Sequence, residues 1–336
     1  MQHFDASIPV QTIISGKLRR YNNLPLWKQL LRPLTIVLPN IRDMFFVGCG
    51  FVQSLVKLLI WRPDVVFTKG GFVCLPVGLS AKILGIPLVI HDSDAHPGLT
   101  NRILAKWAKS IGTGAPLKHY PYPAAITRYV GIPIANEFVP FDKTAQQVAK
   151  QALGCDPHRS LVVVTGGGLG AKRINDAVAL TLQKLVQFTS VILVSGAGQY
   201  DELRAVTPQD DERFQLHAFV SKDMATFLGA ADIVVARAGA TTILELAALA
   251  KPTVLIPNGY LTGGHQLKNA AAYAENDGVA IINEHALDQD PAILVTTLKD
   301  LLDTPEQMQK MSHEFFTFAR PHAAKDMADM IIDAVK

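Results

Sequence analysis

Cysteine is scarce in this sequence, and the few cysteines that occur form no recognised framework. Cys49, Cys74 and Cys155 are widely separated, with no CxxC pair and no histidine cluster beside them. This spacing argues against a disulfide scaffold and a zinc site, and it favours a reducing compartment. A helix-turn-helix signature, zinc-finger spacing and an RNP-like aromatic run are also missing, so we expect no nucleic-acid partner.

Long apolar runs are lacking as well. No cationic stretch followed by a continuous apolar run opens the chain, so we expect no secretory signal. The most apolar segment, residues 44–61, is interrupted by Gln53, Ser54 and Lys57, whereas a membrane-spanning helix needs about 20 predominantly apolar residues. We therefore expect a soluble or peripheral protein.

Acidic residues are sparse in the first half of the chain and abundant in the second. Residues 1–150 contain 17 Lys and Arg against 7 Asp and Glu, whereas residues 151–336 contain 15 against 22. The length suits two domains of roughly 150 residues each. A basic half suggests an anionic lipid surface or nucleic acid as its partner, although an unevenly charged solvated surface explains the pattern equally well.

Strand-like and helix-like segments alternate through both halves. Because strand, loop, helix and strand in this order imply right-handed crossovers, the pattern predicts parallel sheets. We predict an α/β protein with two doubly wound, Rossmann-like domains that face a cleft. The polar segment 135–159, which contains Pro140 and Pro157, marks the junction, with the first domain at 1–140 and the second at 141–313. Apolar strands are expected at residues 64–68, 86–91, 161–165, 190–194, 232–236 and 252–257.

Polar and glycine-rich loops follow the predicted strands. They read KGG from Lys69, HDSD from His91, TGGGLGA from Thr165, ARAGATT from Ala236 and NGYLTGGHQ from Asn258. In parallel sheets, ligands bind beyond the carboxyl ends of the strands. Five such loops therefore predict a ligand cleft and an enzyme.

The glycine loop at residues 165–171 joins a strand to a helix. Its glycines allow a ligand to come close, and the helix N-terminus presents free N–H groups to an anion such as a diphosphate. The spacing also satisfies a GxGxxA dinucleotide motif, but the next strand, residues 190–194, ends without the acidic residue that would hold a ribose. A glycine turn needed only for packing is the alternative.

A second strand-turn-helix segment covers residues 232–245. Thr241 and Thr242 are placed to cap the helix, whose dipole favours a phosphate. Glu245 lies one turn later on the same face and suits the hydroxyls of a ribose. A capping-box-like Thr/Glu pair without a ligand is the alternative.

Two further segments carry polar side chains. Gln266 and Asn269 are three residues apart and offer donors and acceptors that suit sugar hydroxyls, while His265 is as compatible with a structural role as with a catalytic one. Residues 91–101 hold two acids and two imidazoles without the separated partners of a closed metal site. A general base, Asp92 or His91, and a loop held by Asx turns are the two interpretations.

Together and in this order, these four motifs resemble those of the MurG-type enzymes of glycosyltransferase family 28, which have the GT-B fold. The resemblance runs from about Lys17 to the C-terminus and is strongest over residues 69–108 and 231–270. It implies inverting transfer of N-acetylglucosamine from UDP-GlcNAc to undecaprenyl-diphosphate-linked muramoyl-pentapeptide (lipid I to lipid II) in peptidoglycan synthesis. It also implies no obligatory cofactor, no metal site, a divalent cation at most stimulating the reaction, and a peripheral location on the cytoplasmic face of the cell membrane.

The resemblance also assigns roles to single residues. Asp92 aligns with a family glutamate and is the candidate catalytic base. Glu245 would hold the ribose, and Ser221 would lie against the uracil. The other implied substrate-binding residues, from the diphosphate to the sugar and the acceptor, are Gly167, Gly168, Leu169, Asn175, Arg237, Ala240, Thr241, Thr242, Gln266, Asn269, Asp94 and Asn101.

The start of the chain departs from the family pattern. The family opens with a strand and a GGTGGH-like loop, and the first 20 residues here resemble the region that follows them. We therefore expect an incomplete first domain, to which the C-terminal helix 314–336 is added. Either the start of the sequence is truncated or misassigned, or the missing unit comes from a separate N-terminal fragment or partner chain. HDSD also replaces HEQN, Gly168 replaces a serine, and Ala135 stands where an arginine is usual.

Basic residues close to the apolar segment would place the first domain on anionic lipid. They are Lys17, Arg19, Arg20, Lys28 and Arg32. Two other functions remain open. One is a UDP-GlcNAc 2-epimerase-like enzyme, which needs no lipid acceptor, and the other is a non-catalytic nucleotide-sugar-binding subunit that depends on a partner.

Overall fold

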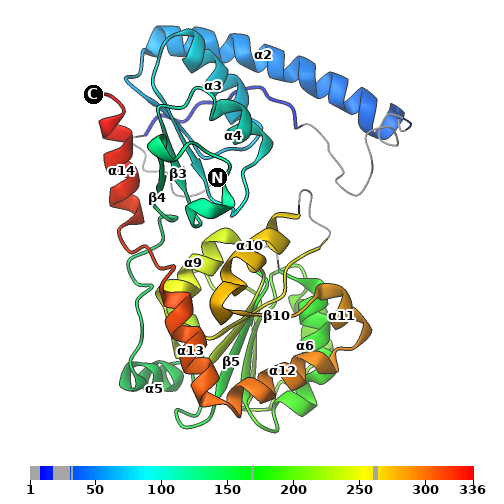
Figure 1. Ribbon diagram of the computed structural model, residues 1–336. Helices are drawn as coiled ribbons and strands as arrows, with labels where there is room; N and C mark the ends of the chain where they lie inside the picture. The colour runs from blue at the N-terminus through cyan, green and yellow to red at the C-terminus, as the bar shows by residue number, and fades with distance from the viewer. Residues whose placement is uncertain (1–7, 18–30, 32, 168–169, 260–263) are drawn as a thin grey trace.

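The computed structural model describes residues 8–17, 31, 33–167, 170–259 and 264–336. These residues form two lobes, each built on a parallel sheet, of four strands in the first and six in the second (Figure 1). The predicted α/β fold with two Rossmann-like domains is therefore confirmed. The domain boundaries at 140 and 313 stay predictions; the first sheet ends at Tyr129 and the second begins at Leu161.

The first sheet has the strand order β1-β2-β3-β4, with every pair parallel. Its strands are β1 (Val66–Thr68), β2 (Leu88–Asp92), β3 (Ser110–Thr113) and β4 (Thr127–Tyr129). The helices of this lobe are η1 (Pro33–Val37), α2 (Leu38–Trp61), α3 (Cys74–Ile83), α4 (Leu99–Leu104), η2 (Leu117–His119) and η3 (Ala124–Ile126).

The second sheet has the order β10-β9-β8-β5-β6-β7, again parallel throughout. Its strands are β5 (Leu161–Thr165), β6 (Ser190–Val194), β7 (Phe214–His217), β8 (Ile233–Ala236), β9 (Thr253–Leu255) and β10 (Ala280–Ile281). Its helices are α5 (Lys143–Ala152), α6 (Lys172–Leu185), α7 (Tyr200–Val206), α8 (Met224–Ala230), α9 (Ala240–Ala248), α10 (His265–Ala274), η5 (Glu275–Asp277), α11 (Glu284–Gln289), α12 (Ala292–Leu302) and α13 (Pro305–Phe316).

The order of the second sheet reverses between β5 and β8. The chain runs outward from β5 to β6 and β7, then returns to the other side of β5 with β8. A crevice forms at the carboxyl edge of such a reversal, because the two connecting helices lie on opposite faces of the sheet. The glycine loop after β5 and the turn after β8 therefore leave adjacent strands and flank one crevice.

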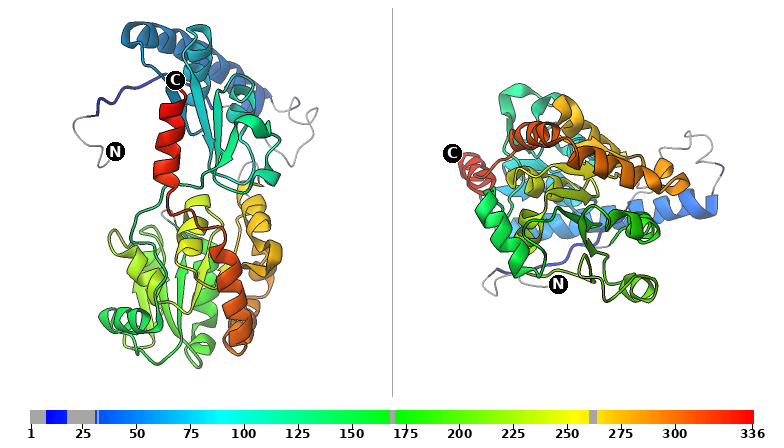
Figure 2. Two further views of the ribbon diagram at one scale, coloured as in Figure 1. Left: turned by 60° about the vertical axis from the view of Figure 1, so that its left-hand side comes forward. Right: turned by 90° about the horizontal axis from the view of Figure 1, so that it is seen from below.

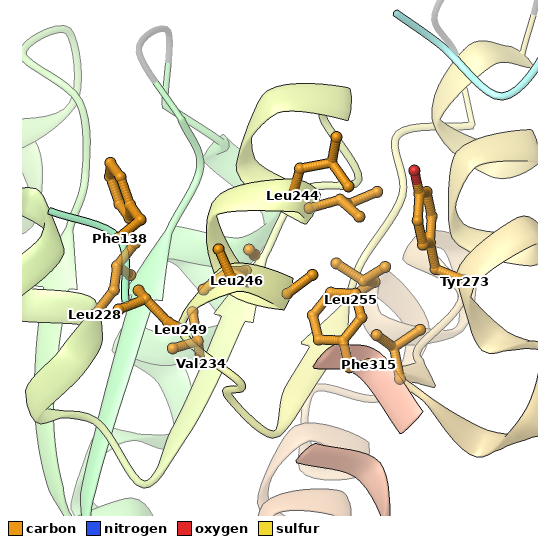
Figure 3. Close-up of a cluster of buried hydrophobic side chains, with 14 of the residues drawn as sticks. Phe138, Leu228, Val234, Leu244, Leu246, Leu249, Leu255, Tyr273 and Phe315 are labelled. Carbon is orange, nitrogen blue, oxygen red and sulfur yellow. The ribbon is translucent and has the colours of Figure 1, made fainter. Parts of the chain in front are cut away.

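Helix α9 is fixed by a large buried core. Strands β5, β6 and β8 are buried along their whole length, as expected of apolar strands covered by helices on both faces. Figure 3 shows Leu246 of α9 among Leu228 and Val234 on one side and Leu255 and Phe315 on the other, all in one buried cluster. The N-terminus of α9, which faces the crevice, is thus held by the core.

The last helix, α14 (Ala323–Asp333), crosses back from the second lobe to the first (Figure 2). Met330 and Ala334 pack on Val89 of β2, and Lys109 donates to the carbonyl of Ala334 at 2.9 Å. Helix α13 instead stays with the second lobe, where Phe315 is fully buried. Two connections therefore join the lobes, the segment before α5 and the segment between α13 and α14.

Helix α2 turns its polar face inward. Asp43, Gly50 and Ser54 are buried against the protein, whereas the large apolar side chains on the other side are exposed. Two of the polar residues that interrupt the apolar run have partners in the N-terminal segment: Gln53 bonds to Ile14 and Thr12, and Lys57 bonds to Gln11. By length and composition, residues 34–61 are long and apolar enough to cross a membrane, contrary to the sequence-based expectation.

Candidate functional site

The glycine loop after β5 has the backbone that its sequence predicts. Gly167 and Gly170 have φ of +76° and +74°, a region that residues with a Cβ rarely adopt. A Cβ on Gly170 would also lie 2.4 Å from the carbonyl oxygen of Ser195. Gly167 is exposed at the carboxyl edge of the sheet. Gly168 and Leu169, both assigned to the diphosphate, lie outside the described residues.

The turn after β8 leads into the N-terminus of α9. Gly239 is the N-cap and Ala240 the first helical residue, and no side chain caps this end. The expectation that Thr241 and Thr242 cap the helix is therefore wrong, because both lie inside its first turn. The uncapped N-terminus favours ligand binding, since uncapped N–H groups at a helix start are free to bind an anion.

Glu245 lies on α9, one turn beyond Thr241. It is half-buried, and its carboxylate has no hydrogen-bond or ionic partner among the residues that the structure describes. Burial raises the pKa of this carboxyl above its usual value, because a partly desolvated charge has lost water without gaining a donor. Such a carboxylate is suited to accept hydrogen bonds from a bound ligand.

Arg237, assigned to substrate binding, has its guanidinium bound within the protein, and its substrate-binding role stays a prediction. The residue is 8% exposed, and its guanidinium donates to the carbonyl of Ile256 at 3.0 Å and to the carboxylate of Glu284. The other oxygen of Glu284 lies 3.2 Å from Arg173 at the start of α6. Arg237 therefore joins the ends of β8 and β9 to α6 and α11. Sequence reasoning missed Glu284, which no motif marks.

Asn175 is also structural. It is fully buried in α6, and its amide donates to the carbonyl of Ser195 at 2.9 Å and to Gln199 at 2.8 Å. It fixes the loop after β6 against the glycine-loop helix, and its assignment to substrate binding stays a prediction. Ser221 is exposed in the loop between β7 and α8, where a ligand can reach it.

Asp94 in the first lobe and Asn269 in the second lobe form a hydrogen bond with each other across the boundary of the lobes. Asn269 on α10 donates to Asp94 at 2.9 Å and to the carbonyl of Ala238 at 3.1 Å, and it accepts from the backbone of Ala95 at 2.8 Å. His265 lies 3.5 Å from the second oxygen of Asp94. The Asn269 amide thus joins the two lobes, and its assignment to substrate binding stays a prediction.

Gln266, by contrast, retains free donors. Its Oε1 accepts from the backbone N–H of Asn258 at 2.8 Å, which fixes the start of the loop between β9 and α10. Its Nε2 has no partner within the described part of the chain. This amide group is available to a sugar hydroxyl beside the turn after β8.

A cavity of about 370 Å³ opens at the carboxyl edge of the first sheet. Asp92 and Asn101 line it from β2 and α4, His265 reaches it from the second lobe, and Lys17 and Lys69 add two cations. The predicted loops KGG and HDSD therefore share one cavity, at the boundary of the two lobes. No group of three or more His, Cys, Asp or Glu suited to a metal ion occurs within the described ranges.

The structure separates the two candidate bases of the HDSD loop. His91 is fully buried, its Nε2 lies 2.8 Å from the carbonyl of Gly131, and burial lowers the pKa of its imidazole to about 4. It cannot reach a substrate. Asp92 lines the cavity at 6% exposure, with the amide of Asn101 donating to it at 2.7 Å.

Tyr122 is a second partner of Asp92 that sequence reasoning missed. Its phenol donates to Oδ2 of Asp92, while Asn101 occupies Oδ1. Burial raises the pKa of the Asp92 carboxyl, and these two hydrogen bonds act in the opposite direction. Tyr122 and Asp92 are 30 positions apart in the sequence, and no motif links them.

Two family models match the chain. The glycosyltransferase family 28 N-terminal domain matches residues 6–113, and the glycosyltransferase family 28 C-terminal domain matches residues 161–327. Among curated relatives, a UDP-N-acetylglucosamine--N-acetylmuramyl-(pentapeptide) pyrophosphoryl-undecaprenol N-acetylglucosamine transferase of an Exiguobacterium strain is 33% identical over 85% of this chain and 78% of its own. A protein of the same name from Lachnospira eligens is 31% identical over 99% and 86%.

Solved structures share the fold. MurG of Acinetobacter baumannii superposes with a TM-score of 0.71 at 23% identity, covering 87% of this chain and 79% of its own. The UDP-GlcNAc 2-epimerase of Neisseria meningitidis, solved with UDP-GlcNAc, gives a TM-score of 0.63 at 12% identity, over 86% and 81%. At these identities the likeness extends to the fold alone.

Proposed function

Because the chain belongs to glycosyltransferase family 28, we propose that it transfers N-acetylglucosamine from UDP-GlcNAc to undecaprenyl-diphosphate-linked muramoyl-pentapeptide. Both domain models of the family match, and relatives above 30% identity carry this activity in their names. The observation in the structure that supports it best is Glu245, an unpartnered carboxylate one turn inside an uncapped helix at the sheet reversal. This arrangement suits a nucleotide diphosphate.

The donor would lie in the second lobe. Its diphosphate would approach the backbone at Gly167 and the N–H groups of Ala240 and Thr241, where helix dipoles favour negative charge. Glu245 would accept from the ribose hydroxyls, and Gln266 would donate to the sugar. No obligatory metal is needed in this scheme, since the two helix N-termini stabilise the charge that develops on the leaving diphosphate.

The acceptor would lie in the cavity of the first lobe. There Asp92 would take the proton of the acceptor hydroxyl while the hydroxyl oxygen attacks the anomeric carbon of the donor sugar. The bond from that carbon to the diphosphate breaks as the new bond forms, UDP leaves, and the configuration inverts. Asp92 suits this role because it faces the cavity and burial raises its pKa.

Replacing Glu245 should weaken donor binding. In Glu245→Ala we expect UDP affinity, measured by calorimetry, to fall by about 1–3 kcal/mol, the value of charge-assisted hydrogen bonds. Because only the carboxylate form accepts from both hydroxyls, wild-type affinity should also fall as the pH drops through the raised pKa, and the variant should lose this dependence. Glu212→Ala, an exposed carboxylate before β7, is the control; equal UDP affinity in all three proteins contradicts the assignment.

The reaction itself is tested with radiolabelled UDP-GlcNAc and a short-chain lipid I analogue. We expect label to move to the lipid, with one UDP released for each transfer. Epimerisation of UDP-GlcNAc without acceptor would support the 2-epimerase-like alternative, whose fold is similar. If the chain binds UDP but catalyses neither reaction, and an added N-terminal fragment restores transfer, the chain is a partner-dependent subunit.

We further propose that the protein attaches to the cytoplasmic face of the cell membrane through α2. Its outward face exposes Ile41, Phe45, Val52, Leu59 and other large apolar side chains. Patches of this kind mark contact with a partner or a membrane. Lys17 is exposed nearby, while Arg19, Arg20, Lys28 and Arg32 lie outside the described residues. The lipid acceptor would thereby be brought to the enzyme.

Charged substitutions on this face should release the protein from membranes. We expect the double substitution Ile41→Glu and Phe45→Glu to weaken binding to phosphatidylglycerol-containing vesicles by tenfold or more, because burying one large apolar side chain contributes about 1.5–3 kcal/mol. UDP affinity should not change. The control is Leu180→Glu on α6, which is 75% exposed in the other lobe. Co-sedimentation equal to wild type would rule out α2 as the contact.

A further inference from the structure

Tyr122 belongs to a loop that holds its side chain in one place. The loop reads Tyr120-Pro121-Tyr122-Pro123, and the two prolines restrict its backbone. The rings of Tyr120 and Tyr122 stack, with centroids 5.9 Å apart and planes 14° apart. The Tyr120 hydroxyl donates to the carbonyl of Asp94 at 2.7 Å and accepts from Ala115 at 3.2 Å. The hydroxyl of Tyr120 thus anchors the loop, and the ring of Tyr122 packs against the ring of Tyr120.

From this position Tyr122 contacts Asp92 from outside the cavity. Asp92 and Asn101 both line the cavity, whereas Tyr122 does not. Each carboxylate oxygen of Asp92 receives one side-chain donor, the phenol on Oδ2 and the Asn101 amide on Oδ1. An oxygen that accepts one hydrogen bond still has a lone pair available. The carboxylate is therefore held in a fixed orientation and remains able to accept a proton from the cavity side.

We propose that Tyr122 is a positioning residue for the acceptor reaction: its phenol, fixed by the stacked Tyr120, orients the Asp92 carboxylate and keeps it ionised. This inference rests on the proposed role of Asp92 as base. It goes beyond that role, because Tyr122 acts only through Asp92 and touches no substrate in the cavity. The hydrogen bond also opposes desolvation, which by itself raises the pKa of the carboxyl.

Several other groups face this carboxylate or its two partners. Lys69, on the loop after β1, and Lys17 line the same cavity, and the backbone of Gly98 before α4 adds a hydrogen bond to Asp92. Asp94, on the loop after β2, raises the pKa of Asp92, and Arg102 on α4 acts on Tyr122. His265 faces the cavity from α10. Unlike these groups, Tyr122 has a donor that a conservative substitution removes. Tyr122→Phe deletes the hydroxyl and keeps both the aromatic ring and the net charge.

The sign of the effect follows from the hydrogen bond. A donor stabilises the ionised form of a carboxyl, so removing it raises the pKa. A base with a raised pKa stays protonated, and therefore inactive, up to a higher pH. In Tyr122→Phe we therefore expect the acid limb of the kcat profile to move to higher pH, by roughly one to two pH units for one hydrogen bond to a charged group.

The experiment compares wild type, Tyr122→Phe and the control Tyr129→Phe in the full chain. The transferase assay with UDP-GlcNAc and the lipid I analogue is run from pH 5 to 9, on the order of ten points per protein, to locate each limb. Tyr129→Phe, on β4 in the same lobe, removes a phenol hydroxyl that donates to the carbonyl of Phe318 at 3.1 Å and does not contact Asp92, so its acid limb should stay in place. Thermal unfolding and UDP affinity show whether each variant is folded, and UDP affinity should equal wild type.

The outcomes test the role of Tyr122 separately from the role of Asp92 as base. A shifted limb in Tyr122→Phe alone supports the proposal. An unshifted limb in a folded Tyr122→Phe overturns it, even if Asp92 proves essential. If Asp92→Asn keeps its activity, the base assignment fails and Tyr122 loses its proposed role with it. Equal shifts in both tyrosine variants would show a general effect of removing a phenol hydroxyl from this lobe and would also overturn the proposal.

Discussion

Asp92→Asn should lower kcat by about 10²- to 10⁴-fold, the usual contribution of a general base. The substitution preserves the size of the side chain, and the amide oxygen can still accept from Tyr122. What it removes is the ability to take a proton from the acceptor hydroxyl. Because Asp92 lies in the first lobe and the donor site in the second, UDP affinity should not change.

The measurement is single-turnover transfer to the lipid I analogue, with calorimetric UDP binding beside it. Asp64→Asn is the matched control, since Asp64 is an exposed carboxylate just before β1 in the same lobe. A kcat for Asp92→Asn within about tenfold of wild type would mean that another group removes the proton. His91 would not be that group, because it is fully buried against Gly131.

Much of the fold could be predicted because its signals are local. Runs such as LVVVT at 161–165 are apolar on both faces, which is typical of a strand covered by helices on both sides. Loops of glycine and polar residues follow such runs and mark the carboxyl edge. The alternation of elements predicts parallel, doubly wound sheets, and the structure adds the strand order, whose reversal between β5 and β8 forms the crevice.

The roles of single side chains were harder to predict, because they depend on partners far away in the sequence. Asn269 is 174 residues from Ala95 and 175 from Asp94, and neither separation leaves a periodic signal. Tyr122 approaches Asp92 through a loop outside the motifs. The sequence places these residues near the cleft, but it does not show that Asp94 and Asn269 bond to each other and leave Glu245 and Gln266 free for a ligand.

Arg237 is the clearest example of a motif residue with another role, and its replacement should cost stability. Arg237 and Glu284 are 8% and 4% exposed and form a buried ion pair. Arg237→Ala removes one of the two cations beside the buried Glu284 carboxylate, while Arg173 stays 3.2 Å from its other oxygen. We therefore expect the free energy of unfolding of the second lobe to fall by about 1–3 kcal/mol, the cost of losing a hydrogen bond to a buried charged group, with the urea midpoint falling by about 0.5–1 M.

The position of the tryptophans makes this prediction specific. Trp61 and Trp107 belong to the first lobe and no tryptophan follows residue 107, so the second lobe contains none. Tryptophan fluorescence therefore does not follow the second lobe, whereas far-UV circular dichroism follows both lobes. The dichroism transition of Arg237→Ala should move further than the fluorescence transition. Arg204→Ala, an exposed arginine on α7, should leave both within about 0.5 kcal/mol. If Arg237→Ala instead unfolds like wild type but loses UDP affinity, the guanidinium binds the nucleotide, and its place in the buried network is wrong.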